Sequence, residues 1–387
     1  MNWKRWVLIL MILSLPLLTT GCWNRRELDK IGIVTEVGID QGENQQIVYT
    51  VQVIIPSGIK RAEGGSSGQG KSTVTFTSSG PTIFDAVRNL TEESGRRLNY
   101  SHTMVIAVGE DMARDGVLPV LDFFVRDHEM RFRTWIVVTS GKAADIVEVT
   151  PPLENLSAKN LRLLLKDYDI VSKSVAVNTL DFFNEITDES LQAVVGKVEI
   201  ANQKEKKGLV LKGAGVFHKD KLVSWLDPMK TRGYLWVRDK IKSGIITIPC
   251  PGQEDKLISL EIKNVKSSIK PYIDEGKMKY RIDVTVESSV GDQMCDIDFT
   301  DPEKIKLLME AQQKKVTEEI EPIIEEAQKN LKLDILGLGE ATMHRFPKEW
   351  KEMKENWEAE FPNAEIEIQV KSKINHTGLI SRVKMNK

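Results

Sequence analysis

The segment that most constrains this chain is an apolar run close to its N-terminus. Lys4 and Arg5 give a short positive start, and the run Trp6–Leu18 that follows is broken only by one serine and one proline. At about 13 residues it is too short to cross ~30 Å of hydrocarbon as a helix, but it has the length of the apolar core of a signal peptide. We therefore predict that residues 1–21 are a cleaved signal peptide. No other segment reaches 18 apolar residues, so the body of the protein is expected outside the cytoplasmic membrane.

A cysteine follows directly, in the sequence Leu18-Thr19-Thr20-Gly21-Cys22. A small residue before a cysteine at this point resembles the lipobox of bacterial lipoproteins in a relaxed form, because a threonine stands where leucine is usual. We predict that Cys22 becomes an N-palmitoyl, S-diacylglycerol cysteine, which carries enough acyl chains for stable membrane anchoring. The alternative is a chance cysteine behind an ordinary cleaved signal.

The charge balance and the cysteine count each exclude one class of protein. The 387 residues contain 54 Lys and Arg against 56 Asp and Glu, so the formal net charge is −2. A broadly basic nucleic-acid binder is excluded, although a local basic patch is not. Three cysteines in this length exclude a disulfide scaffold. Cys250 and Cys295 can either pair with each other or remain buried thiols, and sequence alone does not decide between them.

Alternating and helical patterns interleave along the chain and predict an α+β fold in two or three domains, with mixed sheets and packed helices. Ile47, Tyr49, Val51, Val53 and Ile55 place an apolar residue at every second position, which is typical of a half-buried strand. Thr82 and Asp85 have the spacing of a helix cap. We expect an N-terminal α/β domain over residues 22–200 and a C-terminal α+β domain over 209–387. The polar stretch 201–208 between them is read as a linker or a long hairpin tip.

The longest predicted helix lies in the C-terminal half, over residues 305–331. Pro322 inside it removes one backbone hydrogen bond and should kink it, and Gly337 and Gly339 are expected to end it. A second helix is predicted to carry Trp350 and Trp357 on one face, as core residues in preference to a binding groove. A last strand follows over residues 366–370.

Catalytic and nucleotide-binding patterns are weak throughout. The stretch Gly65–Ser72 matches the phosphate-loop pattern GxxxxGK[ST] residue for residue, but a β pattern follows it where that loop requires a helix. The five histidines are scattered and none has metal-ligand spacing. We expect no enzyme activity, no cofactor, no metal, no nucleotide and no nucleic acid.

One charged cluster stands between a predicted helix and a predicted strand. It contains Arg126, Asp127, Glu129 and Arg131. One interpretation is an ion-pair network at a surface for a protein partner. The other is a solvated loop whose salt bridges contribute little individually.

Several stretches, in order along the whole chain, resemble the Ger(x)C family, the lipoprotein C subunits of bacterial spore germinant receptors. The stretches that carry the resemblance are Gly21–Leu28, Ser101-His102, Leu121–Phe123, Gly215–Phe217, Lys221–Leu226, Thr231–Gly233, Asp334–Gly339 and Pro347–Trp350.

The resemblance implies a partner set and a place in the cell. The partners would be an A subunit with transmembrane helices and a transporter-like B subunit that binds nutrient. The chain would be held by lipid on the outer face of the cell membrane, which becomes the spore's inner membrane. An extracytoplasmic solute-binding lipoprotein remains the alternative.

Overall fold

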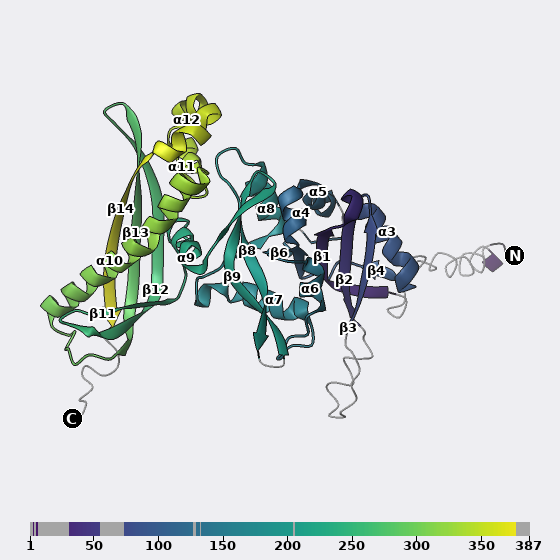
Figure 1. Cartoon of the computed structure of the whole chain (residues 1–387), viewed down its shortest axis with the longest axis horizontal. Helices are drawn as coiled ribbons and strands as arrows, with labels where there is room; N and C mark the ends of the chain where they lie inside the picture. Colours follow the sequence, from purple (N-terminus) through teal and green to yellow (C-terminus); the bar gives the residue numbers. More distant parts are fainter. Residues whose placement is uncertain are drawn as a thin grey trace.

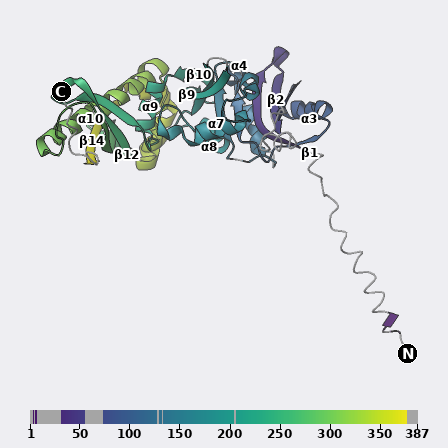
Figure 2. The same ribbon diagram turned by 90° about the horizontal axis from the view of Figure 1, so that it is seen from below.

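A computed structural model describes Trp3, Arg5, Trp6 and residues 31–54, 73–126, 129–131, 133–203 and 206–376. Two units follow each other along the long axis of the molecule: a large sheet with helices on both faces, and a second sheet crossed by one long helix (Figure 1). Figure 2 shows the same succession from below. The α+β class expected from the sequence is confirmed.

The first unit is built on a ten-stranded sheet with the order β10-β9-β8-β6-β5-β1-β2-β3, with β4 paired to β1 and β7 to β6. Strands β1, β5, β6 and β8 run parallel, and antiparallel strands extend the sheet on both sides. The strands are β1 (Ile31–Gln41), β2 (Ile47–Ile54), β3 (Thr73–Gly80), β4 (Arg97–Asn99), β5 (Val105–Val108), β6 (Trp135–Thr139), β7 (Val177–Asn178), β8 (Val194–Gln203), β9 (Lys206–His218) and β10 (Lys221–Leu226).

Helices cover both faces of this sheet, which is why its central strand β5 is apolar throughout. In β5, Val105 and Ala107 face one core while Ile106 and Val108 face the other, and all four are fully buried. Helices α6 and α7 contribute side chains to the first of these cores and α3, α4, α5 and α8 to the second. The helices are α3 (Ile83–Ser94), α4 (Glu110–Asp115), α5 (Leu118–Arg126), α6 (Ala143–Glu148), α7 (Ser157–Lys166) and α8 (Thr179–Thr187). The predicted cap of α3 is present: the Thr82 hydroxyl accepts the Asp85 backbone N–H at 3.2 Å.

The predicted linker at residues 201–208 needs correction. These residues end the hairpin of β8 and β9, with Ala201 opposite Gly208 and Gln203 opposite Lys206. Asn202–Lys207 contains no apolar residue, and the described backbone on either side of residues 204 and 205 is paired in the hairpin. The structure therefore has the hairpin tip in place of the linker. Strands β9 and β10, expected in the second domain, hydrogen-bond into the first sheet.

The second unit is a four-stranded sheet crossed by a long helix. The strands β11 (Ile245–Cys250), β12 (Gln253–Asp274), β13 (Lys277–Gln293) and β14 (Glu365–His376) lie in the order β11-β12-β13-β14. Helix α10 (Pro302–Glu325) runs diagonally over them (Figure 1) and packs on α9 (Pro228–Val237). A disulfide joins Cys250 to Cys295, which resolves the pairing that the sequence left open.

The helices near the C-terminus differ from their prediction in detail. Helix α10 contains Pro322 and continues as a π-helix to Leu331, where Lys332 in the left-handed region (φ 57°) ends it. Gly337, expected to end this helix, instead precedes α11 (Leu338–Arg345).

The predicted second helix is also divided. It consists of α12 (Pro347–Met353), a 3₁₀ turn and α13 (Trp357–Glu360). Trp350 and Trp357 are each 5% exposed, so their prediction as core residues is confirmed.

Candidate functional site

Several predicted functional residues lie outside the described part of the chain. They are Cys22, Asp127 and the phosphate-loop match Gly65–Ser72. The lipid anchor at Cys22 therefore stays a prediction.

The other residues of the charged cluster, Arg126, Glu129 and Arg131, each contact a different neighbour. Arg126 ends α5 and pairs with Asp122 one turn earlier, at 2.7 Å, with 78% of its side chain exposed. Glu129 pairs with Arg97 of β4 at 2.7 Å. Arg131 is exposed, and its backbone carbonyl accepts a hydrogen bond from the Thr134 hydroxyl. Exposed pairs of this kind contribute about 0–1 kcal/mol each. A role as partner surface stays a prediction for these residues.

The carboxyl ends of the parallel strands are where open α/β sheets commonly bind ligands. Here Asp40, at the end of β1, occupies that edge. Its carboxylate accepts the backbone N–H groups of Ala143 and Ala144 at 2.7 and 2.9 Å and thereby caps α6. A Cβ on Gly109, at the end of β5, would lie 2.0 Å from an Asp40 oxygen. The edge is thus filled by the protein's own carboxylate.

A group of buried polar residues lies where the two units meet, around α9. Arg232 is 3% exposed in its side chain and pairs with Glu319 of α10 at 2.7 Å. The Trp236 indole N–H donates to the same Glu319 oxygen at 2.8 Å. The other guanidinium nitrogens of Arg232 donate to the carbonyls of Val171 and Ile245, one in each unit. One side chain therefore binds α10, the first unit and the second sheet together.

A second set of ion pairs surrounds the first. Arg238 pairs with Glu340 of α11 at 2.7 Å, and Lys240 lies 3.8 Å from Glu185 of α8. Burial raises the pKa of Glu185, and Lys240 and Arg238 lower it in part. These pairs join α8 in the first unit to the segment after α9 and to α11 in the second. We call the residues Arg232, Glu319, Trp236, Arg238, Lys240, Glu185 and Glu340 the interdomain joint.

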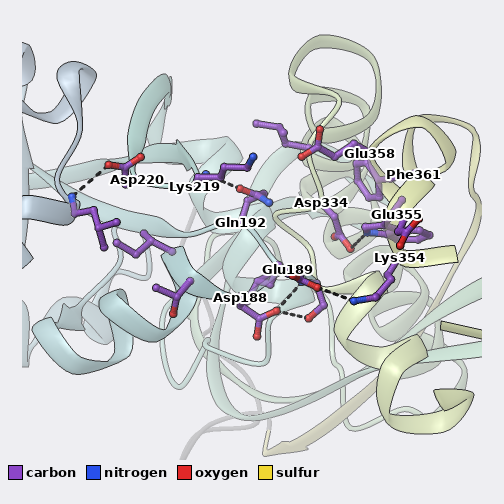
Figure 3. Close-up of a pocket in the computed structure, with 17 residues that line it drawn as sticks. Asp188, Glu189, Gln192, Lys219, Asp220, Asp334, Lys354, Glu355, Glu358 and Phe361 are labelled. Carbon is purple, nitrogen blue, oxygen red and sulfur yellow. Dashed lines mark hydrogen bonds and ion pairs between the residues drawn. The ribbon is translucent and has the colours of Figure 1, made fainter. Parts of the chain in front are cut away.

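A cleft of about 700 Å³ lies beside the interdomain joint (Figure 3). One wall comes from the end of α8, the loop after it and the β9–β10 turn, and the other from α13 and its surroundings. Its charged lining residues are Asp188, Glu189, Asp220, Asp334, Glu355, Glu358, Lys219 and Lys354. Acidic groups outnumber basic ones among these residues.

Polar contacts span the two walls of the cleft. Lys354 pairs with Glu189 at 3.2 Å (Figure 3), and His218 with Glu358 at 3.0 Å. The Gln192 backbone N–H donates to the Asp334 carbonyl at 3.0 Å. The cleft is therefore bridged by groups that also hold the two units together.

Asp334, the most buried acid of the cleft, is already saturated with donors. Its carboxylate accepts four backbone N–H groups from residues 336–339 at 2.7–3.2 Å and the Trp357 indole N–H at 3.1 Å. Burial raises its pKa, and these hydrogen bonds lower it in part. This arrangement fixes the start of α11 and leaves the carboxylate little capacity for a ligand.

Two stretches that carry the family resemblance lie at these contacts. Thr231–Gly233 contains Arg232, and a Cβ on Gly233 would lie 2.4 Å from the Glu319 carbonyl oxygen. Asp334–Gly339 contains Gly337 in the left-handed region (φ 91°). In the sequence these stretches carry a resemblance but indicate no structural role. In the structure Gly233 lets α9 pack closely on α10, and Arg232 beside it reaches the first unit; the Arg-Gly neighbours at 232 and 233 were the available signal.

Across the described ranges, no group of three or more His, Cys, Asp or Glu side chains is arranged to hold a metal ion. The arrangement at the joint and the cleft serves to fix two units relative to each other.

Two family models match the chain in succession. The one described as spore germination protein N-terminal domain covers residues 24–200, and the one described as spore germination B3/GerAC like, C-terminal, covers 212–378. The chain belongs to the Ger(x)C family of spore germination proteins, the C subunits of germinant receptors.

Individual relatives match over nearly their whole length. Spore germination protein KC of Bacillus subtilis (strain 168) is 26% identical over 96% of this chain and 95% of the relative. Spore germination protein B3 of the same organism is 24% identical over 97% and 98%. The crystal structure of the GerBC protein matches with a TM-score of 0.53 at 20% identity, over 87% of this chain and 96% of that one, which supports the fold.

Within the part of the chain that the structure describes, none of the helices is both long enough and apolar enough to cross a bilayer.

Proposed function

We propose that this chain is the lipid-anchored C subunit of a nutrient germinant receptor, held through Cys22 on the outer face of the cell membrane and later the spore inner membrane. It acts there with the membrane A and B subunits and without catalysing a reaction. The observation that carries the proposal is the succession of the two family models over residues 24–200 and 212–378, which begins two positions after the lipobox cysteine.

The described residues support a scaffold in preference to an enzyme. The ligand edge of the parallel strands is filled by Asp40, and the deepest acid of the cleft, Asp334, is saturated by backbone donors. The buried Arg232, paired with Glu319, also donates hydrogen bonds to the Val171 carbonyl in the first unit and the Ile245 carbonyl in the second, which joins the two units. A body of fixed shape on a lipid tether suits a subunit that positions membrane partners.

The anchor is tested with Cys22→Ala, with Thr20→Ala as a control that keeps a small residue before the cysteine. We expect Cys22→Ala to lose labelling by palmitate, to leave the membrane fraction and to abolish the spore's nutrient response, while Thr20→Ala behaves as the parent. A Cys22→Ala protein that stays membrane-bound and fully active in spores would refute the anchor.

The partners are tested by affinity purification of the chain from solubilised spore membranes. We expect the A and B subunits to co-purify with the parent chain. Recovery of the chain without either subunit, from spores in which both are present, would contradict the receptor assignment.

The alternative of a solute-binding lipoprotein has one feature in its favour, the acidic cleft between the units. It predicts a saturable thermal shift of the protein with an amino acid, sugar or nucleoside, which should be weakened by Glu189→Gln. Our proposal predicts no saturable shift with any of these compounds.

A further inference from the structure

Strand β14 (Glu365–His376) forms one edge of the C-terminal sheet, paired on one side with β13. Among the described residues, no strand pairs with its other side. A free edge of twelve residues offers a row of backbone donors and acceptors to another strand. Proteins normally protect such an edge, so the side chains that β14 places there are informative.

The outward face of β14 has an ordered charge pattern. Alternate residues are exposed, and along the strand they read acid, acid, neutral, base, base. They are Glu365, Glu367, Gln369, Lys371 and Lys373. The pattern changes sign about Gln369, so the strand carries opposite charges toward its two ends.

The pairing with β13 shows that a neighbouring strand can place opposite charges against both ends of this pattern. In the parallel register, Lys279 lies opposite Glu365, and their charged groups are 3.0 Å apart. At the other end Glu287 lies opposite Lys373, at 3.6 Å. Opposite charges across neighbouring strands stabilise a pairing, and like charges oppose it.

We propose that the free edge of β14 binds β14 of a second copy of this chain, antiparallel and centred on Gln369. In that register Glu365 faces Lys373 of the second copy, and Glu367 faces its Lys371. Each contact occurs twice by symmetry, which gives four opposite-charge pairs around a central Gln369 pair. The two C-terminal sheets become one eight-stranded sheet.

The rest of the edge is compatible with this pairing. Ile366, Ile368 and Val370 pack against the core from the inner face of β14 but remain half-exposed. In the dimer Ile368 lies opposite Val370 of the second copy, which covers both. The two-fold axis is perpendicular to the sheet, so both copies of α10 lie on the same face.

The same pattern excludes other self-associations. A parallel, in-register pairing would place each glutamate against a glutamate and each lysine against a lysine. A fibre-like stack is thereby disfavoured, while a closed dimer is favoured. The dimer does not depend on the proposed receptor function, because it rests on β14 alone.

The register is tested by cross-linking in the full chain carrying Cys22→Ser, which leaves only the disulfide-bonded cysteines. Directly opposite residues have Cβ atoms about 5 Å apart, so Gln369→Cys should give a covalent dimer with a short thiol cross-linker. Glu365→Cys alone should not, but mixed with Lys373→Cys it should. Absence of cross-linking at Gln369, or equal cross-linking by Glu365→Cys alone, would overturn the register.

The energetics are tested by charge exchange, with sedimentation equilibrium as the assay. Lys371→Glu with Lys373→Glu makes all four pairs repulsive and should raise the dimer Kd about tenfold or more. Adding Glu365→Lys and Glu367→Lys restores opposite charges and should restore the dimer. A parent chain that stays monomeric at all concentrations would refute the proposal. A dimer Kd that does not change with the two lysine substitutions would also refute it. Circular dichroism confirms that each variant is folded.

Discussion

Glu36 is expected to make the stability of this protein fall as pH rises. It lies on β1 beneath α7 and is fully buried. The Ser157 hydroxyl donates to one carboxyl oxygen, and within the described residues the other oxygen has no hydrogen-bond partner. Burial raises the pKa of Glu36 from 4.5 to about 8, because a charge in this core would be poorly solvated, and the Ser157 bond lowers it only in part.

The direction follows from proton binding. Between pH 4.5 and about 8 the native state holds a proton on Glu36 that the unfolded chain releases. Stability therefore falls as pH rises through this window and levels off above it. At 1.36 kcal/mol per pKa unit, the 3.5-unit difference corresponds to about 5 kcal/mol, as an order of magnitude.

The test is Glu36→Gln, which keeps the shape and removes the titration. Urea unfolding followed by tryptophan fluorescence at pH 5, 7 and 9 gives the free energy of unfolding. We expect parent and variant to be similar at pH 5 and the variant to be several kcal/mol more stable at pH 9. Other buried acids are present in both proteins, so they cancel in the difference. The exposed Glu92→Gln serves as a charge-matched control and should follow the parent. Parallel pH curves for the parent and Glu36→Gln would refute the reasoning.

Two further predictions concern the second unit. Glu319→Ala leaves the buried Arg232 unpaired and should lower stability by about 3–5 kcal/mol, whereas the neighbouring exposed Glu318→Ala should change it little; equal effects in urea unfolding would contradict the role of the joint. Replacing Cys250 and Cys295 together by alanine opens a cross-link between residues 45 apart and should cost about 2–4 kcal/mol. Reduction of the parent should reproduce that loss, and a parent indifferent to reductant would contradict it.

Local patterns allowed much of the fold to be predicted. The apolar residues at every second position from Ile47 lie in β2, although residues 49–53 are buried on both faces and not on one as predicted, and the cap at Thr82 begins α3. Both signals depend only on neighbours in sequence. The spacing of Trp350 and Trp357 likewise identified core residues, because helical periodicity reports directly on burial.

The remaining features depend on contacts between distant residues. Arg232 and Glu319 are 87 residues apart, and nothing in the sequence around either residue indicates that the two form a pair. Residues 201–208 allowed both a linker and a hairpin tip, because the end of a hairpin can have the same polar composition as a linker, and only the strand pairing decides for the hairpin. Glu36 is ordinary in sequence, and its altered titration comes from the helix that covers it.

The β8–β9–β10 arrangement limits how the halves of such proteins can be exchanged. The C-terminal family match begins at residue 212, inside β9, whose backbone is hydrogen-bonded to β8 of the first sheet. A chimera joined at residues 201–208 would supply β8 from one parent and β9 and β10, which continue the sheet beyond it, from another. A junction between Leu226 and Asp227 instead leaves the ten-stranded sheet in one parent and begins the second at the cap of α9. The hydrogen bonding of the sheet therefore sets the boundary of the unit that can be exchanged between relatives. That boundary lies about fifteen residues after the start of the sequence match.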